Sequence, residues 1–131
     1  MIYQLHDSQI NEIKLGEKAI TLKFSQGFWT TNEQGKMIEQ LKNCEIVFEI
    51  DRNDVPIEDF LSIRISKKRE IYKTISLKKF MELLKKSPFD MYLEYNCDFA
   101  SSKMLQIHSN HLRVRAEIFI DEIKNVEFVH D

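Results

Sequence analysis

The sequence predicts an α+β fold, with a predominantly antiparallel, strongly curved or barrel-like sheet of about seven or eight strands and one amphipathic helix at about residues 76–86. Two observations support this prediction. Apolar and polar residues alternate with a period of two along most of the chain, as in strands that bury one face. The period changes to that of a helix in one segment only, so we expect a single helix packed on the sheet.

The length and composition indicate one globular unit. With 131 residues, of which 43% are hydrophobic and 31% charged, the chain has enough apolar side chains for one core and too few residues for two. Three glycines and two prolines are too few for a fibrous or disordered protein. We therefore expect a single domain over residues 1–131.

Turn residues divide the first half of the chain into short strands. Gly16 opens the segment GEKA between two alternating runs, which predicts a first hairpin. The turn NEQG at residues 32–35 and the break DRNDVP at residues 51–56 separate the runs that follow. The strands expected here are residues 13–15, 20–24, 28–31, 44–50, 60–66 and about 71–75.

The segment SLKKFMELLKK, residues 76–86, has the spacing of an amphipathic helix. Ser76 is placed to cap the first turn, and Pro88 follows the end. The apolar residues at positions i, i+3, i+4 and i+7 are Leu77, Phe80, Met81 and Leu84.

The segment HSNH, residues 108–111, predicts a hairpin in the last third of the chain. If Ser109 and Asn110 form a two-residue turn, His108 lies opposite His111, and apolar residues face each other along both arms. The strand expected at residues 91–99 joins this hairpin, and VEFV at residues 126–129 forms a last strand. The predicted apolar face carries Leu105, Ile107, Leu112, Val114, Ala116, Ile118 and Ile120. The predicted polar face carries Gln106, His108, His111, Arg113, Arg115 and Glu117, extended by Glu94, Asn96 and Asp98.

The segment LHDSQI, residues 5–10, sets the three residue types of a hydrolase triad side by side. Consecutive residues of an extended chain point to alternate sides, so Asp7 would face away from His6 and Ser8. No nucleophile elbow of the form G-x-S-x-G occurs in the chain. We therefore expect this segment not to be catalytic and the protein not to be an enzyme.

The same segment also carries a resemblance. An opening LHDS-x-I followed by the hairpin INEIKLGEKAITLKF resembles the start of several small uncharacterised bacterial α+β proteins, some of them immunity-protein-like partners of toxins. The resemblance is confined to this N-terminal part and includes no catalytic motif. It implies a non-enzymatic interaction module, such as an immunity-type inhibitor of a bacterial toxin, with a protein as its partner.

The polar face around HSNH is the predicted binding surface. Its arginines favour an acidic partner. The binding residues expected are Asn96, His108, His111, Arg113 and Arg115, together with Trp29. Trp29 is a candidate interface anchor, although its large side chain favours packing against the sheet.

The alternative function is a small enzyme or a ligand-binding or metal-binding protein that uses the same polar face. Facing each other across a tight turn, His108 and His111 could hold one metal ion between them. No zinc motif accompanies them. We therefore expect neither a metal nor another cofactor.

The charge distribution is uneven. The run of residues 67–86, which begins at Lys67 and ends at Lys86, has eight Lys or Arg against two Glu, whereas the whole chain has a net charge of −2. We expect most of these basic residues to lie on the solvent-exposed face of the helix. The alternative is that they bind a protein partner. Nucleic-acid binding is not expected. Proteins that bind nucleic acids owe much of their affinity to a net positive charge, which this chain lacks.

Both cysteines, Cys44 and Cys97, alternate with apolar residues, which predicts buried free thiols. The first residues do not have the pattern of a secretory signal. No apolar run approaches the roughly 20 residues that are needed to cross a bilayer. We expect a cytoplasmic protein without membrane contact. The sequence leaves the oligomeric state open.

Overall fold

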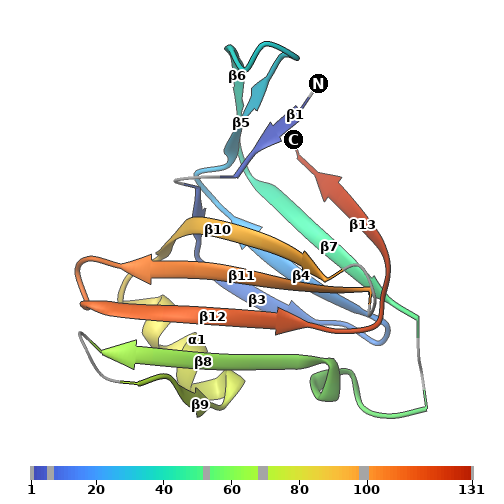
Figure 1. The fold of residues 1–131 in the computed structure, drawn as a ribbon, viewed down its shortest axis with the longest axis vertical. Helices are drawn as coiled ribbons and strands as arrows, with labels where there is room; N and C mark the ends of the chain where they lie inside the picture. Colours follow the sequence, from blue (N-terminus) through green and yellow to red (C-terminus); the bar gives the residue numbers. More distant parts are fainter. Residues whose placement is uncertain (1, 6–7, 52–53, 68–70, 98–100, 131) are drawn as a thin grey trace.

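The computed structural model describes residues 2–5, 8–51, 54–67, 71–97 and 101–130, with the side chains of residues 2–4, 93 and 95–97 outside the description. It is mostly antiparallel sheet with one helix, which confirms the α+β prediction (Figure 1). The elements are β1 (Ile2–Gln4), β2 (Gln9–Ile10), β3 (Glu12–Leu15), β4 (Ala19–Phe24), β5 (Phe28–Thr31), β6 (Met37–Leu41), β7 (Cys44–Ile50), η1 (Ile57–Phe60), β8 (Leu61–Lys67), β9 (Lys73–Ile75), α1 (Leu77–Lys86), β10 (Phe89–Cys97), β11 (Ser102–Ser109), β12 (Val114–Ile120) and β13 (Ile123–Val129).

The strands form three antiparallel sheets. A six-stranded sheet has the order β2-β10-β11-β12-β8-β9, a four-stranded sheet the order β13-β7-β4-β3, and a three-stranded sheet the order β1-β5-β6. The first predicted hairpin is confirmed as β3 and β4, because Leu15 lies opposite Ile20 and the N–H of Gly16 donates to the Ala19 carbonyl at 2.8 Å.

The prediction of one strongly curved or barrel-like sheet of seven or eight strands is wrong. Within the described residues the strands are more numerous, and no sheet is closed or strongly curled. The chain instead changes sheets at short polar breaks. Asn11 separates β2 from β3, and residues 121–122 separate β12 from β13, with a left-handed φ of 55° at Glu122. Two facing sheets bury the same alternate residues that a barrel would, so the pattern alone does not distinguish the two folds.

The core lies between the two larger sheets. Figure 1 shows the four-stranded sheet and α1 behind the six-stranded sheet, and α1 contacts β3 and β8. Alternate residues of both sheets face inward and form one buried cluster. Its members on the central strands include Ile20, Leu22 and Phe24 of β4, Ile46, Phe48 and Ile50 of β7, Leu105 and Ile107 of β11, and Ala116, Ile118 and Ile120 of β12.

The predicted helix is confirmed as α1. The Ser76 hydroxyl accepts a hydrogen bond from the Lys79 N–H at 3.2 Å, so the predicted N-cap is confirmed as well. Phe80 and Leu84 are buried, and the Phe80 ring meets Phe89 edge-on with centroids 5.2 Å apart. None of the helices within the described ranges is long and apolar enough to cross a membrane.

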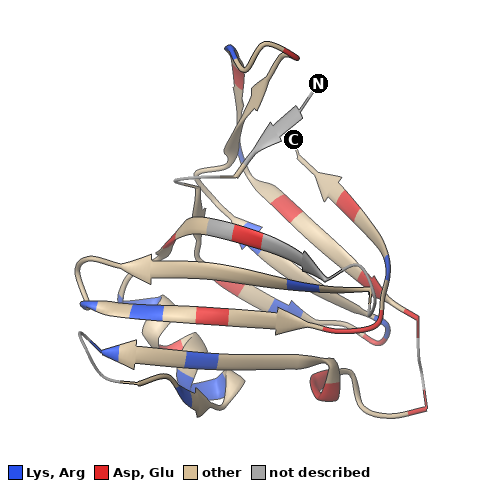
Figure 2. Cartoon of the chain, viewed as in Figure 1, with Lys and Arg blue, Asp and Glu red and all other residues tan. Residues whose placement is uncertain are grey.

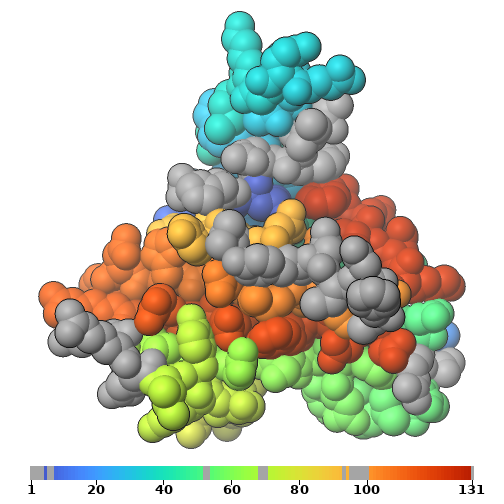
Figure 3. Space-filling view, in the orientation of Figure 1, coloured from blue at the N-terminus to red at the C-terminus, as the bar shows by residue number. Residues whose placement is uncertain are grey.

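The β5–β6 hairpin projects from the body of the molecule (Figures 1 and 3). Phe28 anchors its base between Phe24 and Phe128, with ring centroids 5.9 Å apart in both pairs. The chain enters the hairpin at Gly27, which has a φ of 74° and lies so close to β6 that an added Cβ would be 1.6 Å from the Leu41 carbonyl oxygen. Only glycine fits at this position.

Trp29 lies on this hairpin and remains 42% exposed. The preference for core packing is therefore wrong. The alternation of β5 turns Phe28 and Thr30 inward, which leaves Trp29 on the outer side opposite Gln40.

The structure tests the predicted burial for one of the two cysteines. Cys44, at the start of β7, is buried and is not part of a disulfide, as predicted. Cys97 ends β10, and its side chain lies outside the described residues.

The close approach at Gly27 predicts the effect of an added methyl group. Gly27→Ala should destabilise the protein by about 3 kcal/mol or more, because the methyl group overlaps backbone in addition to the strained φ. Gly35 also has a left-handed φ, of 81°, but an added Cβ there meets nothing within 4 Å. Gly35→Ala is thus the matched control and should lose about 1 kcal/mol. Urea denaturation measures both losses, and equal losses would show that the close approach does not matter.

The burial of α1 predicts a second stability difference. Leu84→Asp should lose about 3 kcal/mol or more, because it places an unpaired carboxylate in the core. Lys79→Asp on the exposed side of the same helix should change the free energy of unfolding by less than about 0.5 kcal/mol. A loss from Leu84→Asp as small as that from Lys79→Asp would contradict the placement of the helix.

Candidate binding site on the six-stranded sheet

The register of the β11–β12 hairpin positions the site. Ser109 lies opposite Val114 and His108 opposite Arg115, so the loop is residues 110–113. The predicted two-residue turn with His108 opposite His111 is therefore wrong. The partner of His108 moves by an even number of positions, so each strand residue keeps its predicted side of the sheet.

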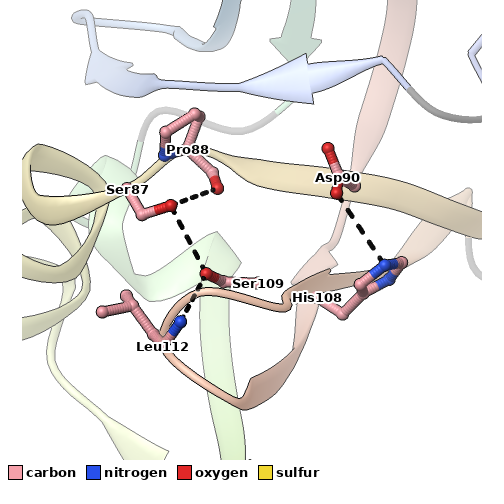
Figure 4. A network of polar contacts seen from close by, with 6 residues as sticks. All are labelled: Ser87, Pro88, Asp90, His108, Ser109 and Leu112. Atoms are coloured by element: carbon pink, nitrogen blue, oxygen red, sulfur yellow. Dashed lines mark hydrogen bonds and ion pairs between the residues drawn. The ribbon is translucent and has the colours of Figure 1, made fainter.

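Two local features make the longer loop stable. The Ser109 hydroxyl accepts a hydrogen bond from the N–H of Leu112 at 3.1 Å, which closes the loop from within (Figure 4). Arg113 has a φ of 56°, the left-handed conformation that turns the chain back into β12. Ser109 is buried, and its hydroxyl also lies 3.5 Å from that of Ser87, just beyond α1.

The outer face of the sheet carries two rows of polar side chains that run across the strands. In the first row, Asp90 of β10, His108 of β11 and Arg115 of β12 lie on adjacent strands in direct register. The Nε2 atom of His108 is 3.9 Å from Oδ2 of Asp90 (Figure 4), and the ring of Tyr92 meets the imidazole edge-on at 6.2 Å between centroids.

The second row is a closed network. Glu117 is only 7% exposed. Its Oε1 accepts from Nη2 of Arg64 at 2.6 Å and its Oε2 from Nε2 of Gln106 at 3.3 Å. The Arg64 guanidinium also lies 5.7 Å from the ring centroid of Tyr72 and 5.0 Å from that of Phe119. These partners compensate a carboxylate that would otherwise be costly to remove from water.

An open depression of about 590 Å³ lies over these rows at the loop end of the sheet. Among its lining residues are Tyr72, Tyr92, Gln106, His108, Arg113 and Arg115. The depression thus joins two cationic side chains and an imidazole with two aromatic rings. Its volume lies within the roughly 300–1,000 Å³ typical of ligand sites.

The predicted binding residues divide into two groups. The structure brings His108, Arg113 and Arg115 together around the depression, whereas His111 is exposed in the loop and is not among the lining residues. Trp29 lies on the projecting hairpin. Asn96 pairs with Lys103 near the other end of β10, and its side chain lies outside the described residues.

The predicted extension of the polar face along β10 is wrong for Glu94. A register shift between Met91 and Leu93 places Glu94 opposite Leu105, where its carboxylate pairs with Lys103 at 3.3 Å. The Lys103 ammonium lies 5.8 Å from the centroid of the Phe48 ring, on the side of the four-stranded sheet. Asp98 lies outside the described residues.

The sequence reading missed both tyrosines of the depression. The same register shift determines where Tyr92 lies, since an extra residue at a bulge re-aims the side chain. Tyr72 precedes β9 and reaches the site through its contact with Arg64. The only available signal was the presence of an aromatic residue within a basic run, at Tyr72.

The segment LHDSQI, residues 5–10, which has the residue types of a hydrolase triad, is only partly described by the structure. His6 and Asp7 lie outside the described residues. Ser8 is 6% exposed, and its carbonyl accepts a hydrogen bond from the N–H of Met91 at 2.7 Å. Ser8 therefore lies directly before β2 and beside β10.

A further charged cluster lies on the four-stranded sheet. Lys23 is 3.9 Å from Glu12 and 3.6 Å from Glu45. Hydrogen bonding with the neighbouring Lys23 lowers the pKa of Lys14, while the same interaction, reinforced by both carboxylates, raises the pKa of Lys23. The charges of this cluster largely compensate one another. In the described ranges, no group of three or more His, Cys, Asp or Glu is arranged to hold a metal ion.

Comparison of the chain with protein-family models, curated proteins and solved structures found no match.

The second polar row predicts which ion pair stabilises the fold. Glu117→Ala should cost about 2 kcal/mol, because it removes a carboxylate whose side chain is only 9% exposed and which accepts from both Arg64 and Gln106. Glu94→Ala removes a carboxylate whose side chain is 42% exposed and which pairs with Lys103 on the same sheet, and it should cost less than about 1 kcal/mol. Urea denaturation of both variants measures the difference, and the reverse order would show that the Glu117 network does not stabilise the sheet.

Proposed function

We propose that the protein is a non-enzymatic binding module that holds an acidic segment of a partner protein in the depression on its six-stranded sheet. The observation that supports this proposal is the gathering of His108, Arg113 and Arg115 around one open depression between Tyr72 and Tyr92. Immunity-type inhibitors of bacterial toxins are modules of this kind, and the resemblance of the opening segment agrees with that role.

The side chains of the depression suit a carboxylate. A guanidinium group presents N–H donors in a planar fork that matches the two oxygens of a carboxylate. The imidazole N–H adds a further donor. Tyrosine contributes a large contact area with few rotatable bonds, which is why aromatic residues are frequent among residues that dominate protein interfaces.

The width of the depression favours a polypeptide over a small molecule. Tyr92 belongs to β10, and Tyr72 contacts Arg64 of β8, three strands away in the sheet. Three strand spacings correspond to about 14 Å. An extended chain segment with several side chains spans this distance, whereas one small anion contacts only part of it.

One observation supports the alternative function, a small enzyme that uses the same surface. His108 lies 3.9 Å from Asp90, and a carboxylate beside an imidazole is the arrangement that orients a general base. An enzyme of this kind would lose activity completely on His108→Ala, whereas a binding module would keep partial affinity.

The proposed function predicts the effect of removing one cation. Arg113→Ala should weaken binding of a fluorescein-labelled glutamate peptide about fivefold at low salt, because it removes one charged contact from the depression. The difference should shrink as salt is added. Fluorescence anisotropy measures the affinity, and circular dichroism verifies that the variant folds.

Lys18 provides the control for this prediction. It is exposed in the turn between β3 and β4 of the other sheet, so Lys18→Ala removes the same charge away from the depression. If the two variants bind the peptide equally well, the depression is not the binding site.

A further inference from the structure

The basic side chains around the depression continue beyond it. At this end of the molecule, Figure 2 shows Lys and Arg on the β11–β12 loop, β8, β12 and α1. The members with exposed side chains are Lys67, Lys85, Lys86, Arg113 and Arg115, and we call this group the basic end.

Backbone pairing and a side-chain contact join the basic end into one surface. Lys67, the last residue of β8, lies opposite Val114, next to Arg113. Lys85 and Lys86 form the last turn of α1, directly before Ser87, whose hydroxyl lies 3.5 Å from that of Ser109 (Figure 4). The C-terminal end of α1 therefore adjoins the same hairpin that carries the depression.

The opposite end of the molecule is acidic (Figure 2). The exposed or half-buried carboxylates there are Asp51, Asp54, Glu58, Asp59, Asp121 and Glu122, and they outnumber the lysines of the same end, which are Lys18, Lys103 and Lys124. At the basic end, the described carboxylates are Glu82, one turn before Lys86, and Asp90, beside His108. An acidic partner is therefore attracted to one end of the sheet and repelled from the other.

We infer that the binding surface extends from the depression around the loop of residues 110–113 onto the C-terminal end of α1, and that its ligand is an extended acidic polypeptide segment. This inference rests on the proposed function, which requires only the depression. Lys85 and Lys86 then bind the part of the segment that passes over the loop. An extended segment of about eight residues covers about 26 Å, enough to cross the loop from the outer face of the sheet to the helix.

Lysines in the last turn of a helix also stabilise it through the helix dipole, without any partner. The two roles are separable. A purely structural role affects the free energy of unfolding but not binding, whereas a binding role affects affinity in a way that depends on position along the helix.

The experiment compares two double variants of α1. Lys85→Gln with Lys86→Gln removes two charges at the basic end, and Lys78→Gln with Lys79→Gln removes two exposed charges at the other end of the helix. The two sites are about 10 Å apart at 1.5 Å per residue. Affinity for a fluorescein-labelled glutamate peptide of about eight residues is measured by anisotropy at physiological ionic strength, where screening acts over about 8 Å.

The expected result is a three- to tenfold loss for the Lys85 and Lys86 variant and less than about a twofold loss for the Lys78 and Lys79 variant. Inorganic phosphate is too small to reach from the depression to the helix, so phosphate bound in the depression should bind the Lys85 and Lys86 variant as it binds the unchanged protein. Amide shifts of His108 in NMR titrations report this binding.

The outcomes distinguish the inference from the proposed function. If Arg113→Ala weakens peptide binding but the Lys85 and Lys86 variant does not, the segment stays within the depression, and the extension is wrong while the proposed function stands. Equal losses in the two helix variants would indicate attraction to net charge alone and would overturn the extension. If the unchanged protein does not bind the glutamate peptide, both proposals fail.

Discussion

The hydrogen bond from the Leu112 N–H to the Ser109 hydroxyl determines much of what the outer sheet face can do. It closes the loop of residues 110–113, and a loop of this length joins β11 to β12 in the register on which the site is built. In that register His108 lies opposite Arg115, and Gln106 lies opposite Glu117. With the shorter turn, His108 would meet a second imidazole, and the depression would lose its present combination of groups.

The two polar rows serve different purposes although they lie side by side. In the row of Gln106, Glu117 and Arg64, the carboxylate accepts from both neighbours, whereas the buried Nε of Arg64 has no hydrogen-bond partner, and the guanidinium also contacts the ring of Tyr72. The row that includes His108 and Arg115 lines the open space. A surface that binds charged partners needs both a rigid support and accessible groups, because a side chain that must be ordered on binding reduces the affinity.

The sequence was sufficient to predict the helix and most of the longer strands with their buried faces, but not β1, β2 and β6 or the face of β10 beyond its bulge. Alternation placed Leu105, Ile107 and Val114 on the inner side, and Ser76 marked the start of α1. These features depend on local periodicity, which a single sequence records directly.

Local periodicity could not predict the number of sheets or the details of the site. A period-two pattern is unchanged when the register moves by an even number of residues, so it allowed the wrong partner for His108. A bulge leaves no mark in composition, which is why Glu94 was placed on the wrong side and Tyr92 was missed. A left-handed position is usually marked by glycine in the sequence, but here the residue is Arg113. Tyr72 depends on a contact with Arg64, which only the folded chain creates.

The edges of the six-stranded sheet determine how another strand can associate with it. Its outermost strands, Gln9–Ile10 and Lys73–Ile75, cover only part of the strands beside them. Within the described residues, β2 pairs with β10 at Phe89 and Asp90 alone, which leaves the rest of β10, as far as Cys97, without a neighbouring strand on that side. An edge of this length can add a strand from another chain through main-chain hydrogen bonds. Binding of that kind depends on the backbone of the incoming strand and tolerates many different side chains.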